Sequence, residues 1–257
     1  GLLLKCLKLI KVVILKMGFD TGNLFQFEEE GLLQEVDIHD VIKVLMTTLS
    51  FRDSYTFEHS WRVAELSTMI AQQMGLSARL VEQIHQAAHL HDIGKISVSD
   101  NVLNKPDNLT TDEIEKIQRH PVIGYKILQK VSLFKSISTI VLYHHERYDG
   151  LGYPGKLKGT DIPLASRIIA VADAFDAITS NRSYRQAKSY HYAYNQINDY
   201  VNEQFCPVVV KSFNDIFESI PEHLAQVDRE IEENFTSKSD VEVINHNDLL
   251  FSKKAQG

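Results

Sequence analysis

Apolar residues recur at intervals of three and four from about residue 40 to residue 220, and alternation with a period of two is scarce. This spacing is typical of amphipathic helices, since strands alternate at every second residue. The sequence therefore predicts an all-α fold, a helical bundle. Thr110 with Glu113 forms a capping-box pattern that predicts a helix start. Residues 149–163 hold four glycines and two prolines, which predicts an irregular Gly-rich loop.

The pattern divides the chain into three parts. We expect residues 1–45 to form an N-terminal leader, residues 46–220 the main domain, and residues 221–257 a C-terminal helix followed by a polar tail. Four lysines interrupt the apolar start of the leader, so no run reaches the roughly 18–20 apolar residues that span a bilayer. Two interpretations of this start stay open: a membrane-surface helix, or an artificial or frame-derived extension before Met17.

Composition narrows the class of protein. Hydrophobic residues make up 44% and charged residues 24% of the chain, which is typical of globular proteins and excludes a disordered or fibrous chain. The net charge of −7 argues against binding of bulk nucleic acid but permits a small anionic ligand in a local basic pocket. Cys6 and Cys206 form no disulfide framework or CxxC metal motif, which favours a reducing cytoplasm.

Polar residues stand on the apolar stripes at positions where core side chains are expected. For example, His59 lies four residues before Val63, on the stripe that continues through Leu66. A buried imidazole or carboxylate without a partner costs several kcal/mol, and a single one is more often a hydrogen-bonded core residue than a ligand. Seven such residues on five predicted helices favour a shared metal centre instead. They are His59, His91, Asp92, His120, His144, His145 and Asp173.

Mixed imidazole and carboxylate ligands suit iron, manganese or zinc. The adjacent pairs His91–Asp92 and His144–His145 suggest more than one ion, and Asp92 could bridge two ions through its two oxygens. Two ions roughly 3.5–4 Å apart promote in-line displacement at phosphorus, so we expect phosphoester hydrolysis. Lys95 shares a helical face with His91 and Asp92, from which it could neutralise charge on a phosphate oxygen.

Further residues could bind the substrate. Arg182 and Arg185 follow Asp173 at the end of its helix, where they either bind phosphate or compensate the helix dipole. In the loop, glycines such as Gly152 allow close approach of the backbone to a ligand. Tyr153 could stack on a base or donate a hydrogen bond to a phosphate.

Other polar residues receive supporting roles. His85 and His89 lie four apart and could form a ligand pair, but we expect supporting or surface roles because the centre already has enough ligands. Glu146 and Asp176 are expected to support ligand residues, and Asp149 to fix the loop. Four histidines lack companions in the sequence and are expected to be solvated: His39, His191, His223 and His246.

Two motifs carry a family resemblance. HDIGK (91–95) and HHERYDGLGYP (144–154) resemble the two halves of the HD-GYP signature of the HD superfamily. Further matching segments follow in the family's order across about residues 50 to 215. The resemblance implies an all-helical HD domain with an irregular GYP loop. It also implies a metal-dependent cyclic-dinucleotide phosphodiesterase, typically one that converts cyclic di-GMP to linear pGpG and, in some members, to GMP, by in-line attack of a metal-bridging hydroxide.

The resemblance also implies roles for single residues. Asp92 would bridge the two ions and, with Lys95, would be catalytic. Tyr153, Arg182 and Arg185, together with Lys95, match positions that hold phosphates and guanines, and Asp53 would add a contact. The implied ligands are His59, His91 and Asp173 for one ion, and His120, His144 and His145 for the other.

The chain departs from the family pattern at three positions. Tyr55 stands where some members carry a glutamate that supports a third ion, so we predict two divalent transition-metal ions. Iron or manganese is favoured, with zinc, nickel, cobalt or magnesium left open. Arg185 replaces a lysine found in other members, which alters hydrogen-bond geometry. Cys206 replaces a common aspartate, which affects only local packing.

Several alternatives remain. The chain could be a sensor that binds a cyclic dinucleotide without cleaving it, or a phosphohydrolase for another phosphoester such as 3′,3′-cGAMP or a mononucleotide. We predict a bacterial cytoplasmic protein without a transmembrane span. Weak association with a membrane surface through the leader, a homodimer and a signalling-protein partner are left open.

Overall fold

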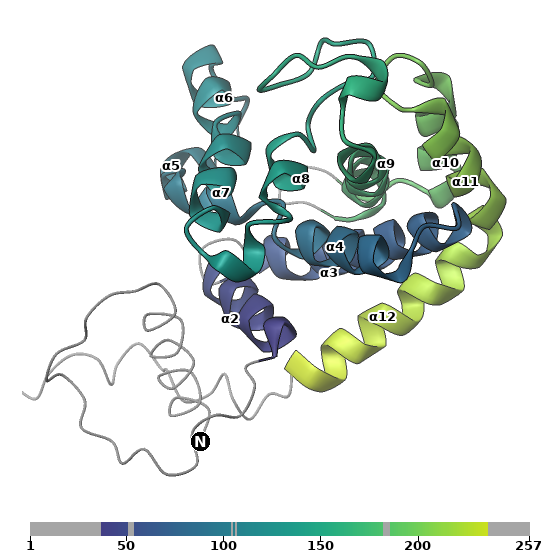
Figure 1. Ribbon diagram of the computed structural model, residues 1–257, viewed down its shortest axis with the longest axis horizontal. Helices are drawn as coiled ribbons and strands as arrows, with labels where there is room; N and C mark the ends of the chain where they lie inside the picture. Colours follow the sequence, from purple (N-terminus) through teal and green to yellow (C-terminus); the bar gives the residue numbers. More distant parts are fainter. Residues whose placement is uncertain (1–36, 51–53, 104, 106, 182–185, 236–257) are drawn as a thin grey trace, which may run out of the picture.

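The computed structural model describes residues 37–50, 54–103, 105, 107–181 and 186–235 (Figure 1). Within these ranges the regular structure is helical, and the β-type pairing they contain is an isolated bridge between Val201 and Phe205. The predicted all-α fold is therefore confirmed. The α-helices are α2 (Ile38–Ser50), α3 (Ser54–Gln73), α4 (Ala78–His89), α5 (Asp100–Leu103), α6 (Thr111–Ile117), α7 (His120–Leu128), α8 (Ser138–Leu142), α9 (Leu164–Thr179), α10 (Tyr190–Asp199), α11 (Pro207–Ile216) and α12 (Ile220–Phe235). Short 3₁₀ helices are η1 (Ile93–Ser97), η2 (Ser132–Phe134), η3 (Gly159–Asp161) and η4 (Phe217–Ser219).

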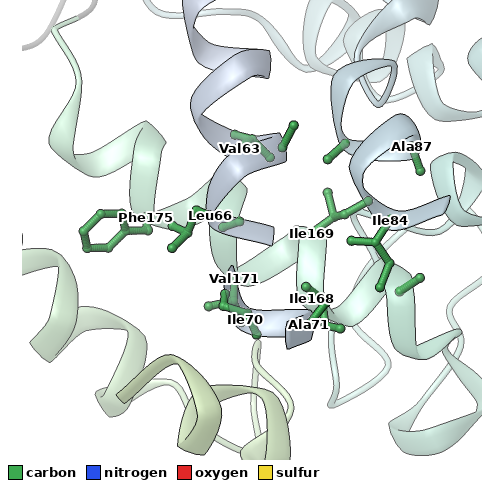
Figure 2. Close-up of a cluster of buried hydrophobic side chains, with 14 of the residues drawn as sticks. Val63, Leu66, Ile70, Ala71, Ile84, Ala87, Ile168, Ile169, Val171 and Phe175 are labelled. Carbon is green, nitrogen blue, oxygen red and sulfur yellow. The ribbon is translucent and has the colours of Figure 1, made fainter. Parts of the chain in front are cut away.

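The hydrophobic core lies where α3, α4 and α9 meet. In Figure 1, α9 is seen end-on, whereas α3 and α4 run across the view. Figure 2 shows their apolar side chains pointing toward one another. Burying one large aliphatic side chain contributes about 1.5–3 kcal/mol, so this cluster fixes the relative positions of the three helices. The labelled side chains are Val63, Leu66, Ile70 and Ala71 of α3, Ile84 and Ala87 of α4, and Ile168, Ile169, Val171 and Phe175 of α9.

The remaining helices pack around this core. α7 packs against η1 and α8, α10 and α11 pack against α9, and α2 and α12 pack against α3. α8 also contacts α4 and α9. As a result, α4 and α8 end close to α9, and the start of α7 lies beside η1 and α8.

The predicted capping box starts α6. The Thr110 hydroxyl accepts a hydrogen bond from the Glu113 backbone N–H at 3.3 Å, and the Glu113 carboxylate accepts one from the Thr110 N–H at 2.8 Å. These bonds satisfy amides that have no partner in the first helical turn. The helix then ends at Ile117, three residues before His120.

Residues 149–163 form the predicted irregular loop, which contains only the short turn η3. Gly150 and Gly159 have φ angles of 86° and 60°, a region that side chains disfavour. Asp149 accepts a hydrogen bond from the Leu151 N–H at 2.9 Å. Asp149 therefore fixes the loop by local hydrogen bonding, as predicted from the sequence.

Glu146 also holds this loop. Its carboxylate accepts hydrogen bonds from the backbone N–H groups of Gly155 at 2.5 Å and Leu157 at 3.1 Å. The described contacts of Glu146 are with loop amides and not with an imidazole, so the predicted support of a ligand side chain is not seen among the described residues. Glu146 fastens the loop directly beside the histidine pair at 144–145.

The three-part division of the chain stays a prediction. One hydrophobic cluster includes Val41 and Ile42 of α2 together with Leu224 and Val227 of α12, so apolar contacts run across both predicted boundaries. The leader up to residue 36 and the tail from residue 236 lie outside the described residues. Within the described ranges, every helix is too short or too polar to cross a bilayer.

Candidate metal centre

The seven residues predicted as metal ligands lie close together in the structure. His59 and Asp173 lie inside the long helices α3 and α9. The prediction that all seven stand on helical stripes is wrong for four of the other five, His91, Asp92, His144 and His145, because α4 ends at His89 and α8 at Leu142. These five stand at helix ends: His91 and Asp92 after α4, His120 as the first residue of α7, and His144 and His145 after α8.

Three of the histidines share one local geometry. The Nδ1 atom of His91 lies 2.6 Å from the carbonyl oxygen of Ala88, three residues earlier. His120 makes the same contact with Ile117 at 2.7 Å, and His144 makes it with Val141 at 2.6 Å. A carbonyl oxygen only accepts hydrogen bonds, so each Nδ1 must carry the proton. With Nδ1 protonated, each of these rings in its neutral form presents an Nε2 lone pair to the centre.

These lone pairs face one another. The Nε2 atoms of His120 and His144 lie 3.3 Å apart, and the His120 Nε2 also lies 3.3 Å from Asp92 Oδ1. The buried Nε2 of His91 has no hydrogen-bond partner among the described residues. Two ligands of a tetrahedral ion at about 2.0–2.1 Å are about 3.3–3.4 Å apart. The donor set and its spacing fit a metal cation, and hydrogen bonding alone leaves the lone pairs opposed.

The ligand atoms form two groups joined by a third. His59, His91 and Asp173 bring one ligand atom each within 4.8 Å of one another, and so do His120, His144 and His145. His91, Asp92 and His144 also lie within this distance of one another and connect the two groups. Asp92 lies between the groups: its Oδ1 is 3.3 Å from the His120 Nε2, and its Oδ2 is 3.4 Å from the His91 Nε2. A carboxylate placed in this way can contact one ion with each oxygen.

Burial and charge set the protonation of these groups. Burial is the main influence on the pKa of His120 and lowers it to about 3, although Asp92 opposes the shift. Burial and the His145 ring lower the pKa of His144 well below its usual value. Burial acts to raise the pKa of Asp92, but Lys95 and the nearby imidazoles outweigh burial and hold it well below its usual range. At neutral pH the His120 and His144 imidazoles are thus neutral, and the Asp92 carboxylate is ionised.

His59 differs because its Nδ1 contacts a carboxylate. This nitrogen lies 2.6 Å from Asp176 Oδ2, while the Nε2 lies 3.3 Å from Asp173 Oδ1. Burial acts to lower the pKa of His59, but the two aspartates outweigh burial and raise it to about 9. Asp176, for which the sequence predicts a supporting role, holds the ring from behind.

Arg62 is a supporting residue that the sequence reasoning missed. Its Nε donates to Asp176 Oδ1 at 2.6 Å, and its Nη1 lies 3.2 Å from Asp228 Oδ1 on α12. The Ser180 hydroxyl also contacts Asp176 Oδ1 at 3.0 Å. The sequence spacing could have indicated this role, because Arg62 follows His59 by three positions and therefore shares its helix face.

Lys95 contacts the bridging carboxylate. Its Nζ lies 2.6 Å from Asp92 Oδ2, and its side chain is 21% exposed. The predicted placement of Lys95 beside Asp92 therefore agrees with the structure, although the segment is the 3₁₀ helix η1 rather than an α-helix. A partly exposed ammonium group at the edge of the centre can contact both Asp92 and a bound anion.

The predicted substrate residues of the loop lie beside the centre. The Tyr153 ring centroid is 4.9 Å from that of His145, and burial, with the Asp173 and Asp92 charges, raises the pKa of Tyr153. Tyr153 thus keeps its hydroxyl proton at neutral pH. A Cβ at Gly152 would meet the Arg147 backbone nitrogen at 2.3 Å, so this glycine permits close packing of the loop on its own chain.

The remaining predictions concern three substrate residues and four histidines. Asp53, Arg182 and Arg185 lie outside the described residues. His39 and His223, which are expected to be solvated, have side chains that are 40% and 35% exposed, but each also has a carboxylate neighbour: the His39 Nε2 lies 3.3 Å from Glu82 Oε1, and the His223 Nε2 lies 3.2 Å from Glu65 Oε2. His191 is exposed, and His246 lies outside the described residues.

An all-α domain whose helix ends bring imidazoles and carboxylates to one buried point belongs to the class of helical domains built around a His/Asp metal site. The family model described as "HD domain" matches residues 43–209. This match covers more than half of the chain, so the chain belongs to the HD domain family, and the resemblance found in the sequence is confirmed.

Curated relatives refine this placement. The chain is 40% identical over 195 residues to a "Cyclic di-GMP phosphodiesterase" of Thermotoga maritima, with 75% of this chain and 52% of the relative covered. It is 44% identical over 150 residues to the "Cyclic di-GMP phosphodiesterase response regulator RpfG" of Xanthomonas campestris, with 58% and 40% covered. The chain thus spans about half the length of these relatives.

A solved structure shares the fold. The crystal structure of the cyclic GMP-AMP specific phosphodiesterase V-cGAP3 of V. cholerae superimposes with a TM-score of 0.57 at 19% identity. The match covers 74% of this chain and 52% of the other. It supports the all-α HD fold deduced from the helices.

Proposed function

We propose that this chain is the catalytic part of a metal-dependent phosphodiesterase that hydrolyses a cyclic dinucleotide. Cyclic di-GMP is the favoured substrate. The expected product is linear pGpG, and GMP is a possible further product. The names of the Thermotoga and Xanthomonas relatives support this substrate. The location that we propose is the bacterial cytoplasm, because Cys6 and Cys206 form no disulfide framework.

One observation carries the proposal. The Nε2 atoms of His120 and His144 face each other at 3.3 Å, while the Nδ1 atom of each ring is committed to a carbonyl oxygen. Such an arrangement is repulsive in a buried site unless a cation lies between the lone pairs. The same argument applies to His91, whose inward Nε2 has no hydrogen-bond partner among the described residues.

The proposed site holds two divalent ions. His59, His91 and Asp173 would hold one, His120, His144 and His145 would hold the other, and Asp92 would contact both. Two such ions supply Lewis-acid polarisation of a phosphoryl oxygen and lower the pKa of bound water. Iron or manganese suits this imidazole and carboxylate set best, and zinc, nickel, cobalt and magnesium are the alternatives to test.

Side chains of the protein would orient the metal ligands and bind the substrate. Asp176 and Arg62 would hold the His59 ring, because their contacts lie on the side away from the centre. Lys95 would place its ammonium against a non-bridging phosphate oxygen, where negative charge develops during hydrolysis. We propose that Tyr153 stacks on a base or donates to a phosphate, and that Asp53, Arg182 and Arg185 add contacts to the dinucleotide.

Two alternative functions can be distinguished from cyclic di-GMP hydrolysis by their products and substrates. A sensor would bind the dinucleotide tightly without releasing a linear product. A related phosphohydrolase would prefer another phosphoester; 3′,3′-cGAMP is the first to test, because the V. cholerae phosphodiesterase that shares this fold is named as specific for cyclic GMP-AMP.

The deciding experiment measures hydrolysis of cyclic di-GMP and 3′,3′-cGAMP by anaerobically purified protein with added manganese or iron. We expect linear product from the native chain and loss of turnover in Asp92→Ala, with an unchanged circular dichroism spectrum. The surface variant Asp215→Ala on α11, whose side chain is 43% exposed, serves as a control. Full activity in a folded Asp92→Ala protein would refute the assignment.

A further inference from the structure

A second group of ligand-type side chains lies outside the candidate metal centre. His39 lies in α2, and Glu82 and His85 lie three positions apart on one face of α4. One ring nitrogen of each histidine and one carboxylate oxygen of Glu82 lie within 4.8 Å of one another. We propose that these three residues, the α2–α4 site, bind one divalent cation of the zinc class and thereby fasten α2 to α4.

The spacing at the α2–α4 site fits metal coordination. The His39 Nε2 lies 3.3 Å from Glu82 Oε1, which is the separation of about 3.3–3.4 Å expected between two ligands of a tetrahedral zinc ion. Two imidazoles and one carboxylate leave a fourth position for water. The His39 and Glu82 side chains are 40% and 45% exposed, so an ion can reach them from solvent.

A further carboxylate supports the inner ligand. Glu65 of α3 places Oε1 3.4 Å from the His85 Nε2 and Oε2 3.2 Å from the His223 Nε2 of α12. A carboxylate that accepts from the ring nitrogen not bound to the metal fixes the orientation of the imidazole and strengthens it as a ligand, so Nδ1 would be the ligand atom of His85. Contacts of this group therefore involve four helices, of which α2 packs against both α3 and α4 (Figure 1).

The ring of His89 lies beside the inner ligand His85. The Nε2 atoms of His85 and His89 lie 3.2 Å apart, and His89 is 5% exposed with no hydrogen-bond partner for its Nδ1 among the described residues. If the His89 Nε2–H donates to the His85 Nε2, this His85 nitrogen carries a lone pair and cannot donate to the Glu65 carboxylate beside it. If His85 donates, the Nδ1–H of His89 is buried without an acceptor.

Both arrangements leave the His89 Nδ1 without a partner in the described structure, and an ion at the α2–α4 site would not contact that nitrogen, so the proposal rests on the three ligand atoms of His39, Glu82 and His85. An exposed ion pair between His39 and Glu82 would also contribute little by itself. A cation held by His39, Glu82 and His85 would add positive charge beside the Glu82 carboxylate, whose Oε1 also accepts a hydrogen bond from Gln86 Nε2 at 2.6 Å. The site is separate from the proposed catalytic ions, so this inference does not depend on the proposed function.

Metal counting after equilibrium dialysis tests the proposal. The full chain, with its catalytic centre loaded, is dialysed against buffered free zinc, and total metal per chain is measured by mass spectrometry for the native protein, His39→Ala and His191→Ala. His39 is chosen because its exposed side chain can be removed without opening the core, and His191 is an exposed histidine on another helix.

We expect His39→Ala to bind one equivalent of metal less than the native chain, and His191→Ala to match the native chain. Zinc should also raise the Tm of the native, loaded protein, and this increase should be absent in His39→Ala. Equal metal content in all three proteins overturns the proposal. Loss of the equivalent in His191→Ala as well would also overturn it, since it would show only adventitious binding by surface histidines.

Discussion

Replacing Asp176 by asparagine separates the orientation of His59 from the ligand set itself. Asp176 is buried, with 2% of its side chain exposed, and its Oδ2 lies 2.6 Å from the His59 Nδ1. Asparagine keeps the volume of the side chain but removes the charge that fixes the proton on Nδ1. Loss of such an outer partner typically lowers metal affinity or activity about 10- to 100-fold, which corresponds to roughly 1.4–2.7 kcal/mol.

The assay is a manganese titration of phosphodiesterase activity against cyclic di-GMP. We expect the manganese concentration for half-maximal activity to rise by the same factor in Asp176→Asn, and excess manganese to restore most of the rate. The matched control is Asp228→Asn, because Asp228 also contacts Arg62, at 3.2 Å, but is 48% exposed and does not contact His59 in the described structure.

Stability must be measured alongside, because removing one partner of a buried ion pair can cost about 3–5 kcal/mol. Arg62 retains Asp228 and Glu58 as neighbours, at 3.2 and 3.6 Å, so we expect the variant to fold. An unchanged metal requirement in folded Asp176→Asn would refute the orienting role. A loss of activity that excess metal does not restore would also contradict it.

Two further predictions follow from the geometry of the centre. Gly94→Ala places a Cβ 1.9 Å from the His120 carbonyl oxygen and 2.6 Å from the Gly124 nitrogen. We expect the free energy of unfolding to fall by about 1–3 kcal/mol and metal binding to weaken, as measured by urea denaturation and metal titration. Native-like stability and metal binding would contradict this prediction, because they would show that η1 and α7 can move apart without cost. In the metal-free protein, His59 keeps its proton up to a pKa of about 9, so metal must displace that proton at neutral pH. We therefore expect metal affinity to rise between pH 7 and pH 9 by up to about tenfold per unit, with proton release measured by calorimetry in two buffers, whereas a pH-independent affinity would contradict the protonation assigned to His59.

The sequence predicted the helical core well because its signal is local. The stripe through Val63, Leu66 and Ile70 and the stripe through Ile84 and Ala87 are buried where the three- and four-residue spacing placed them. The capping box at Thr110 was equally predictable, because all of its atoms lie within four residues.

Contacts between distant segments could not be predicted in this way. Asp176 and His59 are 117 positions apart, and the only hint was that Asp176 follows Asp173 by one helical turn. The contact of His39 with Glu82 was missed because the packing of α2 on α4 is a tertiary property. The loop contacts of Glu146 were missed for the same reason, since its partners are amides of a loop with no periodicity.

The helix ends explain both the error in the predicted stripes and the chemistry of the centre. His91, His120 and His144 each donate Nδ1–H to the carbonyl three residues earlier, in the last turn of α4, α6 and α8. Carbonyls in the last turn have no N–H partner within the helix. A histidine placed there satisfies one such carbonyl only if the helix stops and the ring turns back.

The same contact fixes the tautomer and aims the Nε2 lone pair away from the helix axis. A histidine on a continuing helical stripe would gain neither effect, because the following turn would supply the amide for that carbonyl. Termination of each helix is therefore part of how the chain prepares its imidazoles for a cation. In a helical sequence, a histidine three residues beyond the last apolar position of a stripe is accordingly a stronger indication of a ligand than a histidine within the stripe.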